Sequence, residues 1–83
     1  MNNIDVKENL TFLTEISGDY EKNPREFSQK CEIFRRLSNI KVKAIADELG
    51  VSPVTVTRFE KGITRNIAIL RYYVNLFGPE VFK

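Results

Sequence analysis

The chain has 83 residues, with 13 basic and 11 acidic side chains, a formal net charge of +2, one Cys and no His or Trp. This length suits one small domain, and a hydrophobic content of 42% is enough to bury a core. The lack of histidine excludes His-based acid–base catalysis, Ser-His and Cys-His nucleophile pairs and nearly every common zinc site. We therefore expect neither an enzyme nor a metal protein.

The first predicted helix covers residues 4–16, where apolar side chains recur at helical spacing. They are Val6, Leu10, Leu13 and Ile16. We expect this helix to end at the Ser17-Gly18-Asp19 sequence, and a short connector to follow over residues 20–23. Residues 1–23 are thus predicted to be a helical extension of a main compact unit over residues 24–83.

The sequence Asn23-Pro24-Arg25-Glu26 predicts the start of the next helix. Asn can cap, Pro is preset for the first helical position, and Glu three residues after the cap can reach back to it. Over residues 24–38, apolar side chains then lie along one stripe: Phe27, Cys31, Phe34 and Leu37. The position of Cys31 on this stripe favours core packing over a reactive thiol.

Three further helices are predicted downstream, each ended by a glycine. They cover residues 41–49, which precede Gly50, residues 53–61, which begin after Ser52 and precede Gly62, and residues 67–77, which precede Gly78. A loop is expected over residues 63–66, and residues 79–83 suit a turn or a short final helix.

One run of β-branched residues, Val51 and Val54–Thr57, would also suit a strand. Its Ser-Pro start and Gly stop favour a helix. The sequence therefore predicts an all-α fold, a compact bundle of about five helices.

Residues 42–59 combine four requirements of a helix-turn-helix. Ala46 is small where the second helix would cross the first, and Gly50 can adopt the left-handed conformation of the turn. One face of the second helix is apolar, through Val51, Val56 and Phe59. The opposite face, which would reach a DNA groove, carries Pro53, Val54, Thr57 and Arg58. We therefore predict a unit that binds double-stranded DNA.

Two segments, Ile45-Ala46-Asp47-Glu48-Leu49-Gly50-Val51-Ser52 and Val56-Thr57-Arg58-Phe59-Glu60-Lys61-Gly62, resemble the lambda-repressor/Cro-like helix-turn-helix family. The resemblance covers about residues 35–78. It implies a lambda-repressor-like bundle and a bacterial or phage transcriptional regulator, such as a repressor, that reads the major groove. In that family an Arg on the preceding helix commonly pairs with the Glu that ends the recognition helix. Arg35 and Glu60 hold those positions here.

The sequence departs from the family at the start of the first motif helix. The family usually has Ser or Thr followed by Gln there, whereas this chain has Lys41 and Val42. A cap and a phosphate-contacting glutamine are thereby lost. Asn39 is an alternative cap, and Lys41 or Lys43 an alternative source of phosphate-binding charge. Residues 1–23 have no counterpart in the minimal family domain. Residues 51–58 also resemble Trp-repressor-like proteins, but the Glu60-Lys61-Gly62 ending favours the first family.

The expected contacts divide into base-reading and phosphate-binding residues. Arg58 can donate to both acceptors of guanine, Thr57 can bond or give a methyl contact, and Val54 suits a thymine methyl group. Pro53 contributes shape only. The expected phosphate-binding residues are Lys43, Ser52, Thr55, Lys61 and Arg65.

The charge is distributed unevenly, which bears on the partners. Residues 1–34 hold seven acidic and four basic side chains, whereas residues 35–65 hold three acidic and seven basic ones. The basic segment favours DNA binding. The acidic extension is expected first to complete the core; the alternative is that it binds a protein partner or competes with DNA for the basic face. The helix over residues 67–77 is apolar on nearly every side, so either the N-terminal helix or a second subunit must cover it. Members of the family that the chain resembles commonly dimerise through this region, and we therefore expect a homodimer. The alternative function is a protein-interaction module, such as an antitoxin or accessory protein.

The single cysteine cannot form an internal disulfide and favours a reducing compartment, so we expect a cytoplasmic protein. The sequence shows no signal-peptide pattern, and no apolar run approaches the ~18 residues of a membrane span. A membrane partner is therefore not expected.

Overall fold

The computed structural model describes residues 16–82, and all regular secondary structure within them is helical. The predicted all-α class is confirmed. In chain order the elements are α2 (Ser17–Lys22), α3 (Pro24–Leu37), α4 (Val42–Leu49), α5 (Pro53–Glu60), α6 (Ile67–Phe77) and the short 3₁₀ helix η2 (Pro79–Phe82). Apart from Ile16, the helix predicted over residues 4–16 lies outside the described residues.

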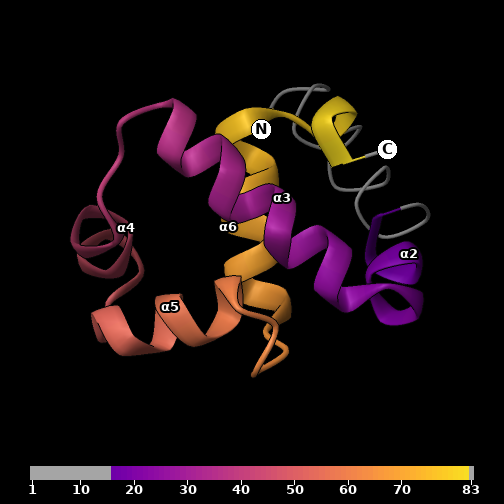
Figure 1. Ribbon diagram of the computed structural model, residues 1–83, viewed down its shortest axis with the longest axis horizontal. Coiled ribbons are helices and arrows are strands. Elements are labelled where there is room, and N and C mark those ends of the chain that lie inside the picture. Colours follow the sequence, from indigo (N-terminus) through magenta and orange to yellow (C-terminus); the bar gives the residue numbers. More distant parts are fainter. Residues whose placement is uncertain (1–15, 83) are drawn as a thin grey trace, which may run out of the picture.

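Two longer helices, α3 and α6, cross at the centre of the bundle (Figure 1). The α4–α5 pair lies on one side of this crossing and α2 on the other. Helix α5 packs against both α4 and α3, and η2 returns onto α6. The core between these elements is rich in aromatic rings, including Tyr20, Phe59, Tyr73 and Phe82, each at most 2% exposed.

The predicted helix break at residues 17–19 and connector at residues 20–23 are wrong. Residues 17–22 form α2, and the backbone of Ile16 is helical as well (φ −73°, ψ −45°). The physical reason lies in tertiary packing, because Tyr20 is buried against the rings of Phe27 and Phe59. That burial outweighs the roughly 1 kcal/mol by which Gly18 disfavours a helix.

Helix α3 begins at Pro24 as predicted, but the side chain of Asn23 makes no capping hydrogen bond. The predicted apolar stripe is correct for Phe27 and Cys31, which are buried, and wrong for Leu37, which is 73% exposed. Leu37 is the last residue of α3, and the chain turns away directly after it. A periodic pattern identifies the inward face of a helix but not how far the neighbouring elements extend along it.

The turn after α3 corrects the expectation that Asn39 caps the next helix. Asn39 has a left-handed backbone (φ 58°), and its N–H donates to the carbonyl of Arg36. It therefore ends α3 in the way a C-terminal Gly or Asn commonly does. Lys41 is the N-cap residue of α4, with no side-chain cap bond.

Helices α4 and α5 are joined by a three-residue turn, and both have nearly the predicted bounds. Gly50 has φ 69°, and the N–H of Val51 donates to the carbonyl of Ala46 at 3.0 Å. Ile45 and Ala46 on α4 and Val56 and Phe59 on α5 are fully buried. Their apolar faces therefore fix how the two helices pack on the core.

Helix α6 has the predicted bounds, and Asn66 caps it by accepting a hydrogen bond from the N–H of Ile69 at 3.1 Å. Its buried residues are Ile69, Leu70, Tyr73 and Val74. Ile67 and Leu76 remain 42% exposed, so α6 is a core helix with an open edge. The final predicted turn or short helix is the 3₁₀ helix η2 within residues 79–82.

Candidate functional site

The outer face of α5 carries the four residues expected to read bases. Pro53, Val54 and Arg58 are exposed, and Thr57 is half-buried. Their spacing along α5 places them on one side of the helix, opposite the buried Val56 and Phe59. The structure thus brings the four predicted residues together on one surface.

The N-terminal end of α5 is held by a local cap. The Ser52 hydroxyl accepts a hydrogen bond from the N–H of Thr55 at 3.3 Å, and the two hydroxyls lie 2.9 Å apart. The Ser-Pro sequence thus starts the helix as predicted. Because both hydroxyls already bond within the cap, Ser52 and Thr55 are less available to a phosphate than the sequence suggested.

The basic residues expected to bind phosphates lie at separate points around α5. Lys43 on α4 is exposed and pairs with Asp47 at 3.5 Å, an ion pair too solvated to hold its ammonium group in place. Lys61 and Arg65 are both exposed in the segment that joins α5 to α6. The three cations therefore flank α5 from two different elements.

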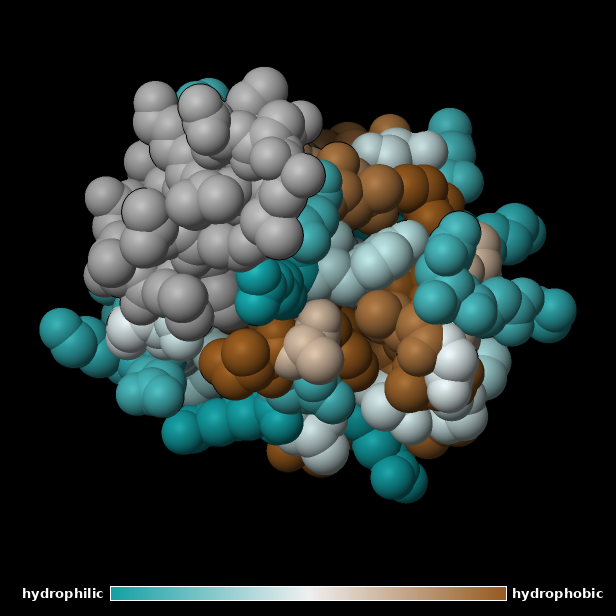
Figure 2. Space-filling model, turned by 180° about the vertical axis from the view of Figure 1, so that it is seen from behind, coloured by the Kyte–Doolittle hydropathy of each residue, from teal (hydrophilic) through white to brown (hydrophobic). Residues whose placement is uncertain are grey.

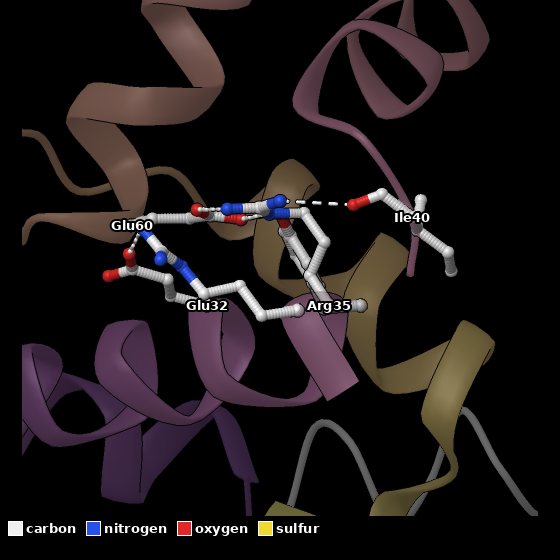
Figure 3. A network of polar contacts seen from close by, with 6 residues as sticks. Glu32, Arg35, Ile40 and Glu60 are labelled. Atoms are coloured by element: carbon white, nitrogen blue, oxygen red, sulfur yellow. Dashed lines mark hydrogen bonds and ion pairs between the residues drawn. The ribbon is translucent and has the colours of Figure 1, made fainter. Parts of the chain in front are cut away.

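The C-terminal end of α5 is held by buried polar contacts. The Arg35 guanidinium donates from Nε to Glu60 Oε2 at 2.7 Å and from Nη2 to Oε1 at 3.0 Å. Its Nη1 donates to the carbonyl of Ile40 at 3.0 Å (Figure 3). The two residues that the family resemblance paired are thus in contact, in a bidentate geometry. Arg35 is 9% exposed and Glu60 3% exposed.

Tyr73 completes this group, and sequence reasoning missed its role. Its hydroxyl donates to Glu60 Oε2 from α6. Burial, followed by the hydrogen bond to Glu60, raises the pKa of Tyr73 above its ordinary range, so the hydroxyl keeps its proton. The hydrogen bond to Glu60 is likewise the main reason that the pKa of Arg35 is raised. The available signal was a tyrosine on a buried helix, because a buried phenol requires a polar partner.

A recess of about 220 Å³ lies between α3, α4 and α5. Its lining includes Thr57 from α5, Lys61 directly after that helix, Val42 from α4, and Arg36 from α3. Arg36 is largely exposed and pairs with Glu32 at 2.7 Å. Arg36 follows Arg35 directly, but no sequence pattern pointed to it as a binding residue. The recess places this cation beside the outer face of α5.

Comparisons of the chain with protein-family models, with curated proteins and with solved structures found no match. Within residues 16–82, no helix is both long and apolar enough to cross a membrane. The same residues contain no group of three acidic or cysteine side chains placed to hold a metal ion.

Proposed function

We propose that this protein binds double-stranded DNA sequence-specifically as a helix-turn-helix transcriptional regulator of the lambda-repressor/Cro-like type. In this proposal α4 and α5 are the two motif helices, and α5 enters the major groove. A binding protein of this kind needs no catalytic group. Its buried free thiol, Cys31, suits the reducing cytoplasm.

The observation that carries the proposal is that one face of α5 is buried and the opposite face is exposed. Its inner face and C-terminal end are buried against α3, α4 and α6 through Val56, Phe59 and Glu60. Its outer face remains open, with an Arg among small side chains. A helix whose inner face is packed against the core, and whose outer face carries short and partly polar side chains, is suited to insertion into a groove.

Arg58 is the proposed main base-reading residue, because an exposed guanidinium can bond to both acceptors of guanine. Val54, 55% exposed, supplies an apolar contact for a thymine methyl group. Phosphate contacts come from Lys61 and Arg36, which line the same recess beside α5, and from Lys43 and Arg65. Arg36 is an addition that the recess beside α5 supports.

The experiment that tests the proposal is selection of bound duplexes from a random DNA pool, followed by titration of the selected site at increasing salt. A specific, salt-dependent complex is expected, because released counterions make phosphate binding weaken as salt rises. Lys30→Ala is the matched control for Lys61→Ala, since Lys30 lies over the Phe27 ring on the opposite flank of α3. Loss of affinity in both variants, or no complex at low salt, would overturn the proposal.

The proposed assembly is a homodimer, so that two α5 helices meet half-sites about one DNA turn apart. It is supported by exposed apolar side chains at the C-terminal ends of α3 and α6: Ile33, Leu37 and Leu76. Beneath them, the Phe34 and Phe77 rings meet with centroids 5.9 Å apart. Figure 2, which shows the molecule from behind the view of Figure 1, shows hydrophobic surface exposed in patches between hydrophilic residues. Leu37→Glu should reduce the sedimenting mass from dimer to monomer, and a wild-type monomer at all concentrations would exclude the dimer.

A further inference from the structure

The segment that joins α5 to α6 carries two of the exposed cations, Lys61 and Arg65. Its first half is tied to the end of α5, because the N–H groups of Gly62 and Ile63 donate to the carbonyls of Phe59 and Arg58 at 3.0 Å. The N–H of Thr64 also donates to the carbonyl of Arg58, at 3.4 Å. These bonds end at Thr64, so the position of Arg65 also depends on what holds the next residue, Asn66. Asn66 is the last residue of the segment and the cap of α6.

Asn66 is held from α2. Its backbone N–H donates to the hydroxyl of Tyr20 at 3.2 Å, across 46 positions of sequence. Tyr20 is 2% exposed, and its ring packs against those of Phe27 and Phe59. The acceptor oxygen is therefore fixed by the core. This oxygen belongs to α2, within residues 1–23, which have no counterpart in the minimal domain of the family that the chain resembles.

A second contact from the same side reaches the beginning of the segment. A Cβ at Gly62 would lie 3.4 Å from Cγ of Arg25 and 3.7 Å from its Cα, so the first turn of α3 already packs closely on this glycine. Gly62 also has φ +74°, which disfavours any other residue. The segment is thus contacted near both ends by residues from the α2–α3 region.

Arg65 lies close enough to Tyr20 to affect it electrostatically. Burial raises the pKa of Tyr20, and the Asn66 N–H and, more weakly, the positive charge of Arg65 oppose that rise. The phenol is consequently neutral at physiological pH. A neutral hydroxyl in a fixed position can accept the Asn66 N–H without pairing Arg65, whose guanidinium remains exposed.

We propose that Tyr20 is a positioning residue for DNA binding: through the Asn66 N–H it holds the α5–α6 segment so that Arg65 contacts a DNA phosphate. The proposal rests on the DNA-binding function above. It assigns α2 a role at the interface without touching DNA. A tyrosine that only filled the core would need its ring and not its hydroxyl.

The test begins with Tyr20→Phe, which keeps the ring and removes the acceptor oxygen. We expect DNA affinity to fall about three- to tenfold, the range expected from one lost hydrogen bond. The slope of log affinity against log salt should also decrease by up to about 0.9, the value of one phosphate contact. Hydrogen exchange of the Asn66 amide, measured by NMR without DNA, should become faster while amides in α4 are unchanged.

A double-mutant cycle then separates positioning from general loosening of the fold. In an Arg65→Ala background, Tyr20→Phe should have no further effect on DNA affinity. In a Lys43→Ala background, where the lost cation lies on α4, it should keep its full effect. Equal effects of Tyr20→Phe in both backgrounds, or unchanged exchange of the Asn66 amide, would overturn the proposal. If the wild-type protein forms no salt-dependent DNA complex, the proposed function itself is wrong. If the wild-type protein binds DNA but Tyr20→Phe has equal effects in both backgrounds, only the role of Tyr20 is wrong.

Discussion

At its C-terminal end α5 is held by side chains from two other helices, whereas at its N-terminal end it is held by its own cap. Glu60 receives Arg35 from α3 and Tyr73 from α6, and all three groups are buried. Ser52 and Thr55, by contrast, bond to each other and to the first turn of the helix. The end that meets the core is thus fixed by long-range contacts, and the end that meets solvent by local ones.

This difference agrees with the proposed insertion of α5 into a DNA groove. A side chain that contacts DNA must stand clear of the domain, so the elements that orient it have to act from the opposite end. A buried ion pair adds less to stability than its geometry suggests, because both ions lose hydration. We therefore attribute to Arg35 and Glu60 mainly the orientation of α5. Variants at the two ends should accordingly differ in which property they change.

The largest effect is expected from Arg35→Ala. Removing the guanidinium leaves the carboxylate of Glu60 buried without its cation, which should lower the free energy of unfolding by about 3–5 kcal/mol. Urea denaturation monitored by circular dichroism measures this change. Arg36→Ala, which breaks a pair that is largely exposed, is the matched control and should cost less than about 1 kcal/mol. Similar midpoints for the two variants would show that the buried pair does not hold the domain together.

Tyr73→Phe tests the contribution of α6 to the same end of α5. The substitution keeps the ring contacts with Phe59 and Phe77 and removes only the hydroxyl that donates to Glu60. A hydrogen bond to a charged group is worth about 1.5–3 kcal/mol, and we expect a loss of unfolding free energy in this range. Tyr72→Phe removes the hydroxyl of the half-buried neighbour, and its unfolding free energy should change by less than about 0.5 kcal/mol. A loss as large in Tyr72→Phe would mean that the Glu60 contact is not the cause.

Arg58→Ala tests the open face of α5 and should separate binding from stability. We expect a loss of about 1–3 kcal/mol of binding free energy on the selected DNA site, with relaxed preference at one base pair. The free energy of unfolding should change by no more than about 0.5 kcal/mol, because the side chain is exposed. Lys61→Ala should instead weaken binding to all sequences alike and lower the salt slope by about one. If Arg58→Ala also lost affinity equally on every sequence, Arg58 would be a phosphate contact and not a base-reading residue.

Much of this contrast could be predicted from local sequence. Ser52, Pro53, Gly50 and Gly62 define α5 and the preceding turn through backbone geometry, which depends on few neighbours. The outer face of α5 follows from helical spacing alone. The contact between Arg35 and Glu60 came from a family resemblance, since no periodic pattern relates residues so far apart.

Contacts that depend on tertiary packing could not be read in this way. The helical conformation of Gly18 depends on Tyr20 reaching Phe59, and the exposure of Leu37 depends on where the other elements end. Glu60 could be predicted as the partner of Tyr73 only if the packing of α5 against α6 were already known. Asn39 could have been recognised as the end of α3, because Asn adopts left-handed backbone angles more readily than most residues.

The pH dependence of stability tests the buried surroundings of Glu60 at the C-terminal end of α5, because Cys31 is affected by its charge. Burial, and then the negative charge of Glu60, raise the pKa of this thiol above its ordinary value near 9. The unfolded chain therefore releases the thiol proton at a lower pH than the folded protein. The stability linked to it is complete below pH about 9 and is lost above it, by up to about 1.4 kcal/mol per pH unit. Unfolding free energies measured from pH 8 to 10 should fall less steeply in Cys31→Ala, and parallel curves would contradict this linkage.

The smallest effect is expected at the locally held end, from Ser52→Ala. Loss of the hydroxyl removes the acceptor of the Thr55 N–H, and an N-cap of this kind is worth about 1 kcal/mol. Because Pro53 still begins the helix, α5 should fray over its first turn without leaving the core. Ser52→Asp, which restores an acceptor, should recover the lost stability but weaken DNA binding, since it adds a negative charge where a phosphate lies in the proposed complex. Compared with Ser52→Ala, the Ser52→Asp variant should therefore have a higher free energy of unfolding but a lower affinity for DNA. Such a divergence is expected only if this end of α5 faces DNA, because the same variant on a solvent-facing helix would improve stability alone.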